Sequence, residues 1–313
     1  MKRFLIVLAL LFFIIGSAFF FYHKNRDKKH EITIGFLGDV MLGRMVNDFL
    51  NESKDMRYSW GDMYDELHQT DLNIANMEFA LTTSEYVVPK VFNFKSLPTH
   101  VRVLQEGRID VVNLANNHVL DFDVEGFKET LNVLDQEGIA HVGAGLTIVD
   151  AQKPAIFNIK GVKIGIIGCT DNEPGWRATK TKPGINFVQI GDLNSIKPVI
   201  EKVRPFVDLL ILTMHWGPNM RQRPSAEFVQ FAHALIDAGV DIIHGHSAHL
   251  FQAVELYKNG VIMYDTGDAV DDYAVDPILR NDWSFFYKIV FDKRIQQIAL
   301  VPITISNMQM NKE

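Results

Sequence analysis

The chain has 313 residues, 47% of them hydrophobic, 11% aromatic and 22% charged, a composition that excludes a disordered, collagenous or coiled-coil protein. Its one cysteine, Cys169, excludes a disulfide scaffold and a cysteine-based zinc ribbon. The formal net charge is −7, but residues 1–30 contribute +5, which leaves −12 for the rest. This acidic body excludes a general nucleic-acid binder, so we expect no nucleic-acid partner.

The first thirty residues contain a long apolar run. Residues 4–22 carry no charge, span about the thickness of a membrane and follow a basic start, as in an export signal. We therefore expect residues 1–30 to form an uncleaved signal anchor with one transmembrane helix and a basic flank. Because only three residues precede the apolar run and a large body, residues 31–313, follows it, we expect a single-pass cell-membrane protein whose main domain is extracellular. The alternatives are cleavage at residues 16–18 and, less consistent with a helix apolar on every face, a buried core helix.

From residue 31 onward, short β-like runs alternate with helical patterns. Several runs are apolar throughout, as expected of strands buried on both faces. Helical patterns follow Asp123 and Ser225, and residues 283–291 and 297–305 are typical of a closing antiparallel pair. The expected strands are residues 32–37, 71–75, 109–114, 163–167, 209–214, 242–244 and 261–264.

This alternation predicts an α/β fold in which helices cover two sheets, layered α/β/β/α. No linker divides residues 31–313, so we expect them to form one domain. Together with the apolar run, the sequence predicts a layered sandwich preceded by one N-terminal transmembrane helix.

Polar side chains stand just past the carboxyl ends of five of these runs. In open α/β sheets, binding and catalytic sites assemble at this edge. Carboxylate, amide and imidazole donors without thiolates suit Zn, Mn or Fe. Two such cations need about six or seven protein ligands, and a neutral imidazole beside them can protonate a leaving group. The candidates are Asp39, Glu78, Asn117, His118, His215, His246 and His249.

Each of these residues also has a simpler interpretation. Asp39 could cap the next turn, and Asn117 could be a turn residue. Glu78 could be a solvated acid, and His215 could be a packed histidine. Because such side chains follow five different strands, a shared site is favoured over five separate explanations. His244 lies inside its β-like run, so we expect a core position for it instead.

Five motifs occur in order between residues 32 and 272. They are Gly38-Asp39-Val40-Met41-Leu42-Gly43-Arg44, Ala75-Asn76-Met77-Glu78, Asn116-Asn117-His118-Val119-Leu120-Asp121, His215-Trp216-Gly217 and Gly245-His246-Ser247-Ala248-His249 with Gln252. Together they resemble the CapA-type capsule synthesis proteins, which include the poly-γ-glutamate synthesis accessory proteins. That family is similar to the calcineurin-like metallophosphoesterases. The resemblance implies a metallophosphoesterase-like sandwich in residues 31–313.

The resemblance also implies a site with two divalent ions, of Mn, Zn or Fe, and an anionic polymer or phosphate-like substrate. Asp39 would be the first ligand, and Glu78 would stand at the position of a metal-bridging aspartate. His118 would be the acid near the leaving group, oriented by Asp121, and Arg44 would hold an anionic substrate oxygen. The remaining metal ligands would be Asn117, His215, His246 and His249.

Three departures from the family pattern bear on activity. Met41 stands where the superfamily usually has a histidine, and Ser247 and Ala248 replace the middle of the usual Gly-His-His-Pro-His. A segment that usually reads Ser-Leu-Gly-Asn-Phe is Asp265-Thr266-Gly267-Asp268-Ala269 here. The acids of this region could strengthen cation binding, repel an anionic substrate or form an acidic surface loop; they are Asp265, Asp268, Asp271 and Asp272.

Three functions are consistent with these features. The first is a membrane-anchored extracytoplasmic protein that supports synthesis of capsule or poly-γ-glutamate beside membrane synthetase subunits. The second is a dinuclear metal-dependent phosphoesterase or hydrolase that acts on another substrate, and the third is a non-catalytic scaffold with a degenerate metal site. Because the body is acidic, contact with a polyanion should be local, at a metal or at Arg44, Arg221 and Arg223.

Overall fold

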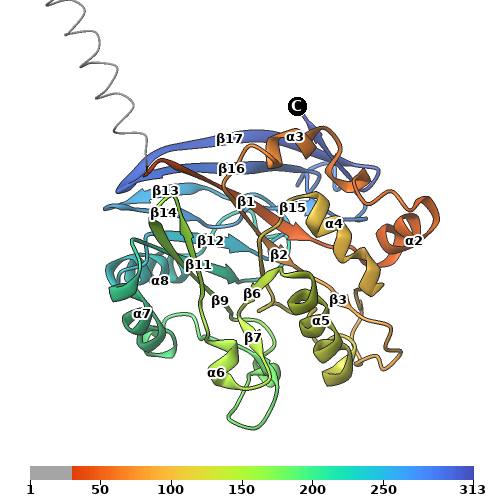
Figure 1. Cartoon of the computed structure of the whole chain (residues 1–313), viewed down its shortest axis with the longest axis horizontal. Helices are drawn as coiled ribbons and strands as arrows, with labels where there is room; N and C mark the ends of the chain where they lie inside the picture. Colours follow the sequence, from red (N-terminus) through yellow and green to blue (C-terminus); the bar gives the residue numbers. More distant parts are fainter. Residues whose placement is uncertain (1–29) are drawn as a thin grey trace, which may run out of the picture.

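Figure 1 shows the computed structural model of the chain, which describes residues 30–313. The predicted transmembrane helix at residues 4–22 lies outside this described part. Between His30 and Glu313, no helix is both long and apolar enough to cross a membrane.

Two large sheets form the centre of the body. The first runs β18-β17-β16-β1-β2-β5-β6, with β15 paired to β1, and the second runs β13-β14-β12-β11-β9-β8. The first sheet consists of β1 (Ile32–Val40), β2 (Leu72–Met77), β5 (Val111–Asn113), β6 (Ala140–Val142), β15 (Asp268–Val270), β16 (Trp283–Asp292), β17 (Arg294–Ser306) and β18 (Gln309–Lys312). The second consists of β8 (Ala155–Ile159), β9 (Val162–Thr170), β11 (Leu209–His215), β12 (Ile242–His246), β13 (Val254–Tyr257) and β14 (Gly260–Met263).

Smaller elements connect these strands. Two short pairs of strands are β3 (Ala80–Leu81) with β4 (Lys95–Ser96), and β7 (Ala144–Gly145) with β10 (Gly184–Ile185). The α-helices are α2 (Arg44–Ser53), α3 (Tyr64–Leu67), α4 (Val101–Glu106), α5 (Asp123–Glu137), α6 (Ile148–Ala151), α7 (Lys197–Val203) and α8 (Ala226–Asp237). Short 3-10 helices cover Tyr58–Met63, Pro98–His100, Pro174–Trp176, Leu193–Ser195 and Arg204–Phe206.

Apolar side chains fill the space between the sheets and cover both outer faces. Phe36 and Ile74 of the first sheet belong to the same buried cluster as Ile211 of the second. Outside the first sheet, α5 adds Phe127 to a second cluster, and outside the second sheet, α8 adds Phe231 to a third. The order of layers is therefore helix, sheet, sheet, helix (Figure 1).

The predicted α/β class is confirmed, and every predicted strand coincides with an observed one. The helical patterns after Asp123 and Ser225 are α5 and α8, and the closing antiparallel pair is β16 with β17. The strand ends differ from the prediction. Asp39, His215 and His246 lie within β1, β11 and β12 rather than just past them, because all three still pair with neighbouring strands.

The chain before β15 approaches β1 so closely that residue 38 has no room for a side chain. A Cβ at Gly38 would stand 1.7 Å from the carbonyl oxygen of Gly267. The same approach lets Asp39 N donate to Gly267 O at 2.9 Å and makes Asp39 and Asp268 register partners. A glycine at position 38 therefore brings two acidic residues side by side.

Gly38→Ala should destabilise the protein by about 1–3 kcal/mol, because a backbone carbonyl would have to shift. Gly175→Ala is a matched control, since in the described structure a Cβ there meets no atom within 4 Å. Denaturant unfolding of the full chain, followed by tryptophan fluorescence, measures the difference. Equal unfolding midpoints for the two variants would contradict the close approach.

Candidate metal centre

The carboxylate of Asp39 lies at the centre of a buried polar cluster. Asn76 and Asp268 are its register partners on β2 and β15. Asn76 Nδ2 donates to Asp39 Oδ1 at 2.7 Å, and Ser247 N donates to Oδ2 at 3.2 Å. Burial alone would raise the pKa of Asp39, but His249 and the neighbouring imidazoles hold that pKa below its ordinary value. Asp39 is therefore an ionised carboxylate.

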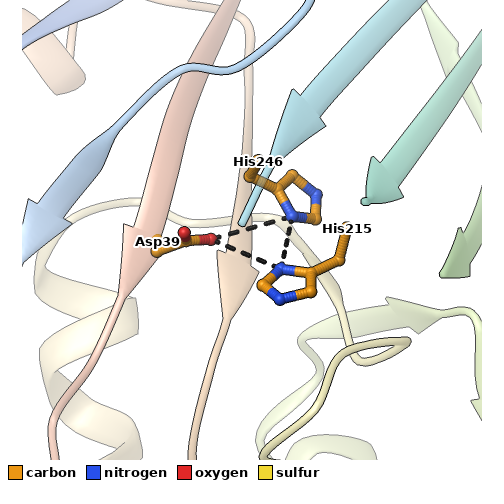
Figure 2. A group of neighbouring side chains, drawn as sticks. All are labelled: Asp39, His215 and His246. Atoms are coloured by element: carbon orange, nitrogen blue, oxygen red, sulfur yellow. Dashed lines mark hydrogen bonds and ion pairs between the residues drawn. The ribbon is translucent and has the colours of Figure 1, made fainter. Parts of the chain in front are cut away.

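Figure 2 shows the first group of potential metal ligands, Asp39, His215 and His246. The two histidines end neighbouring parallel strands, β11 and β12, and are register partners. Their Nδ1 atoms lie 3.0 Å apart, and they lie 3.8 and 3.7 Å from Asp39 Oδ1. Burial lowers the pKa of His215 to about 3 and the pKa of His246 well below its ordinary value. Both imidazoles are therefore neutral, which is the state that binds a metal.

Asp39 also belongs to a second group, with Glu78 and His249. Glu78 follows β2, and His249 lies in the turn after β12. His249 Nδ1 lies 3.4 Å from Asp39 Oδ2 and 2.8 Å from Asp268 Oδ1. Glu78 Oε1 lies 3.9 Å from His215 Nε2, so the two groups are contiguous.

The carboxylates of the second group require positive charge. Burial, and then the charge of Asp39, raise the pKa of Glu78 well above its ordinary value. Although burial would lower it, Asp268 and Glu78 raise the pKa of His249 well above its ordinary value. Without a cation, protons on Glu78 and His249 therefore offset the negative charge of these carboxylates. A divalent cation would offset that charge instead, so its binding would release protons.

Several buried polar atoms of the cluster have no hydrogen-bond partner within residues 30–313. They include Glu78 Oε1, Asp268 Oδ2 and Asn117 Oδ1. Buried carboxylate oxygens without partners are costly unless a charge or a metal satisfies them. The donors are oxygen and imidazole nitrogen, a set that suits Mn, Zn or Fe. Each of the two groups could therefore hold a metal ion, and the residue common to both is Asp39 rather than Glu78.

Sequence reasoning missed an asparagine network behind Asp39. Asn113 Nδ2 and Asn116 Nδ2 donate to Asn76 Oδ1 at 3.0 and 3.2 Å. These bonds orient the Asn76 amide so that its Nδ2 faces Asp39. Asn76 and Asn113 are register partners on β2 and β5. Buried asparagines at equivalent positions of adjacent strands are the signal that could have revealed this support.

His118 and Asp121 form the least buried side of the cluster. His118 Nδ1 lies 2.6 Å from Asp121 Oδ2, and His118 Nε2 lies 3.8 Å from Glu78 Oε1. Asp121 Oδ1 also accepts from Lys90 Nζ at 2.9 Å, a contact from a distant loop that no sequence pattern indicates. Burial, the largest influence, lowers the pKa of His118. His118 is 6% exposed, whereas the five carboxylate and imidazole ligands are at most 1% exposed, so His118 is the member of the cluster nearest the surface.

The structure places Asn117 beside this pair and Arg44 at the rim. The backbone oxygen of Asn117 accepts from Lys90 Nζ, and its ligand role stays a prediction. Arg44 Nε lies 3.1 Å from both carboxylate oxygens of Asp272, and its guanidinium lies 4.8 Å from the centroid of the Phe94 ring. Because Asp272 already neutralises Arg44, an anionic substrate would have to compete with that ion pair.

The alternative of an acidic surface loop at residues 265–272 is wrong. Asp265, Asp268 and Asp271 are at most 5% exposed. Asp265 accepts from Ala248 N at 2.7 Å and from Gly267 N at 2.9 Å, which holds the turn after β12 in place. Asp268 binds His249 directly. These acids are therefore structural parts of the cluster.

Three proteins named for capsule, PGA or polyglutamine synthesis are similar to this chain over most of its length. A "probable polyglutamine synthesis accessory protein" of Mycobacterium tuberculosis is 31% identical over 295 residues, covering 88% of this chain and 77% of its own. The PGA biosynthesis protein CapA of Bacillus subtilis is 30% identical, covering 83% and 70%. The capsule biosynthesis protein CapA of Bacillus anthracis is 29% identical, covering 80% and 62%.

Two solved structures share the fold. A hypothetical protein of Thermus thermophilus superposes with a TM-score of 0.54 at 17% identity, covering 88% of this chain and 100% of its own. The sulfate thiohydrolase SoxB of the same organism has a TM-score of 0.51 at 11% identity, covering 90% and 58%. Residues 33–273 match the family described as "Bacterial capsule synthesis protein PGA_cap". The resemblance to CapA-type proteins is therefore confirmed, and this chain belongs to the bacterial capsule synthesis family PGA_cap.

Proposed function

We propose that this protein supports synthesis of an anionic capsule polymer of the poly-γ-glutamate kind, using a dinuclear metal-dependent hydrolase centre. Relatives named for capsule, PGA or polyglutamine synthesis support the biological part. The pair of buried ligand groups that share Asp39 carries the chemical part. One cation would be held by Asp39, His215 and His246, and the other by Asp39, Glu78 and His249, with Asn117 as a further ligand.

Divalent cations bound there would supply Lewis-acid charge, which lowers the pKa of a water molecule and neutralises an oxyanion. The chain itself supplies the proton donor. Asp121 holds the Nδ1–H of His118, so Nε2 is the atom at which this imidazole would first take up a proton and then give it to the leaving group. Lys90 holds Asp121 from its other oxygen and so fixes the orientation of the imidazole.

A scaffold with a purely structural metal site is the second candidate. The five carboxylate and imidazole ligands are at most 1% exposed, as in a site closed to substrate. Met41, where the superfamily usually has a histidine, is buried in a hydrophobic cluster with Val46 and Leu50 of α2. The two candidates differ in whether His118 is needed for turnover.

We further propose that residues 1–30 anchor the protein in the cell membrane, with residues 31–313 outside the cell beside membrane synthetase subunits. The uncharged apolar run at residues 4–22 supports this arrangement. The body begins at the amino end of β1, whereas Asp39 lies near its carboxyl end. At about 3.3 Å per residue, Asp39 lies roughly 23 Å along β1 from Ile32.

The metal proposal predicts about two equivalents of Mn, Zn or Fe in the purified full chain, measured by elemental analysis. Asp39→Asn should remove both, because Asp39 belongs to both groups, whereas His246→Ala should remove one. His233→Ala is the control, since His233 pairs with Glu255 outside the cluster. An unchanged metal content in Asp39→Asn would rule out the shared site.

The hydrolase proposal predicts that His118→Ala loses about 10²–10⁴-fold in turnover of aryl phosphate or phosphodiester substrates. Its metal content should match the wild type, because His118 belongs to neither ligand group. His141→Ala, which alters a contact with Asp135 on another part of the surface, should keep full activity. A metal-loaded wild type that turns over no substrate would favour the scaffold instead.

The biological proposal predicts that cells without the protein make no polymer although their synthetase subunits are present. Complementation by the wild type should restore polymer output, and protease added to intact cells should degrade the body. Complementation by His118→Ala should fail if the site is catalytic and succeed if the protein is a scaffold. Normal polymer output in cells lacking the protein would contradict the assigned role.

A further inference from the structure

A second polar pair lies deeper between the sheets than His215 and His246. Thr213 on β11 and His244 on β12 are register partners, two residues before those histidines. Because side chains alternate along a strand, all four residues face the same side of the second sheet. Thr213 and His244 are fully buried, which confirms the core position predicted for His244. The proposed chemistry uses neither of them.

These side chains form a continuous chain of hydrogen bonds that ends at His246. His244 Nε2 lies 2.9 Å from the carbonyl oxygen of Leu37, and His244 Nδ1 lies 3.1 Å from Thr213 Oγ1. Thr213 Oγ1 in turn lies 3.0 Å from His246 Nε2. The chain thus connects the backbone of β1 to the ring nitrogen of His246 opposite the one that faces Asp39.

The carbonyl at one end determines the position of each hydrogen in the chain. A carbonyl only accepts, so His244 Nε2 must carry a hydrogen. In a neutral His244, Nδ1 then accepts from the Thr213 hydroxyl. Since that hydroxyl has donated its only hydrogen, its oxygen accepts from His246 Nε2–H. His246 Nδ1 therefore carries a lone pair, which faces Asp39 Oδ1 at 3.7 Å and can accept from His215 Nδ1 at 3.0 Å.

The surroundings of His244 favour its neutral form. Among the described residues, its hydrogen-bond partners are the Leu37 carbonyl and the hydroxyls of Thr213 and Thr266, none of them ionised. The Thr266 hydroxyl donates to Gly245 O at 2.9 Å, so it also accepts from His244. The ring of Phe36 packs edge-on at 5.2 Å between centroids. A buried imidazolium with no counter-charge in contact would be costly there.

We propose that Thr213 and His244 are positioning residues that hold His246 as its Nε2–H tautomer and present the Nδ1 lone pair to a divalent cation. A hydrogen bond to the far nitrogen of a ligating histidine sets its tautomer and ring orientation, and its loss typically costs about 10–100-fold in metal affinity. The cation rests on the proposed function, whereas the tautomer is a property of the metal-free protein.

Zn²⁺ affinity of the full chain, measured by competition with a chelator, tests the role in metal binding. Thr213→Val keeps the shape but removes the hydroxyl, so Zn²⁺ should bind about tenfold or more weakly. Thr213→Ser keeps the hydroxyl and should bind as the wild type does. Thr130→Val is the control, because this buried threonine bonds to Gly126 O on α5, away from the cluster. Equal affinity of Thr213→Val and the wild type would overturn the inference.

Nitrogen-15 NMR of the metal-free full chain, labelled at histidine, tests the tautomer itself. The His246 signals are assigned by their loss in His246→Gln. The wild type should show a hydrogen on Nε2 and none on Nδ1, and Thr213→Val should lose this single form. A wild-type His246 with its hydrogen on Nδ1 would overturn the inference. If the wild type binds no metal, the proposed function fails, and the NMR result still decides the tautomer.

Discussion

The buried, ionised carboxylate of Asp39 is the feature on which the rest of the site depends. An unpaired carboxylate at this depth would be costly, so the surrounding groups must donate hydrogen bonds or carry positive charge. Asn76 and the backbone of Ser247 donate to it, and His215, His246 and His249 surround it. Because these groups come from both sheets, the charge of one side chain ties the two halves of the sandwich together.

The parallel strands explain how so many donors reach one point. Adjacent parallel strands keep their residues in register, so Asp39 stands beside Asn76 and Asp268, and His215 stands beside His246. The same register repeats one layer deeper, where Thr213 stands beside His244. In the proposed metal centre, a layered support of this kind would hold the ligands in place before a cation arrives, which would reduce the cost of binding it.

The burial of the ligands limits how the site can act. His118 forms the least buried side of the cluster; its ring packs edge-on against Phe94, and Phe94 in turn lies beneath the Arg44–Asp272 ion pair. Turnover by the proposed hydrolase would therefore require a substrate to approach from the side of His118.

The sequence by itself determined the strand runs, the residue types at their ends and the family, because hydrophobic periodicity and short motifs are local properties. Only the tertiary structure decided that Asp39 is common to both ligand groups, that Asp265, Asp268 and Asp271 are buried, and that Asp272 neutralises Arg44. The sequence likewise could not predict the contact of Lys90 with Asp121, the asparagine network behind Asp39 or which ring nitrogen of His246 carries a hydrogen. Each depends on contacts between residues far apart in the chain, and these are set by how the two sheets pack.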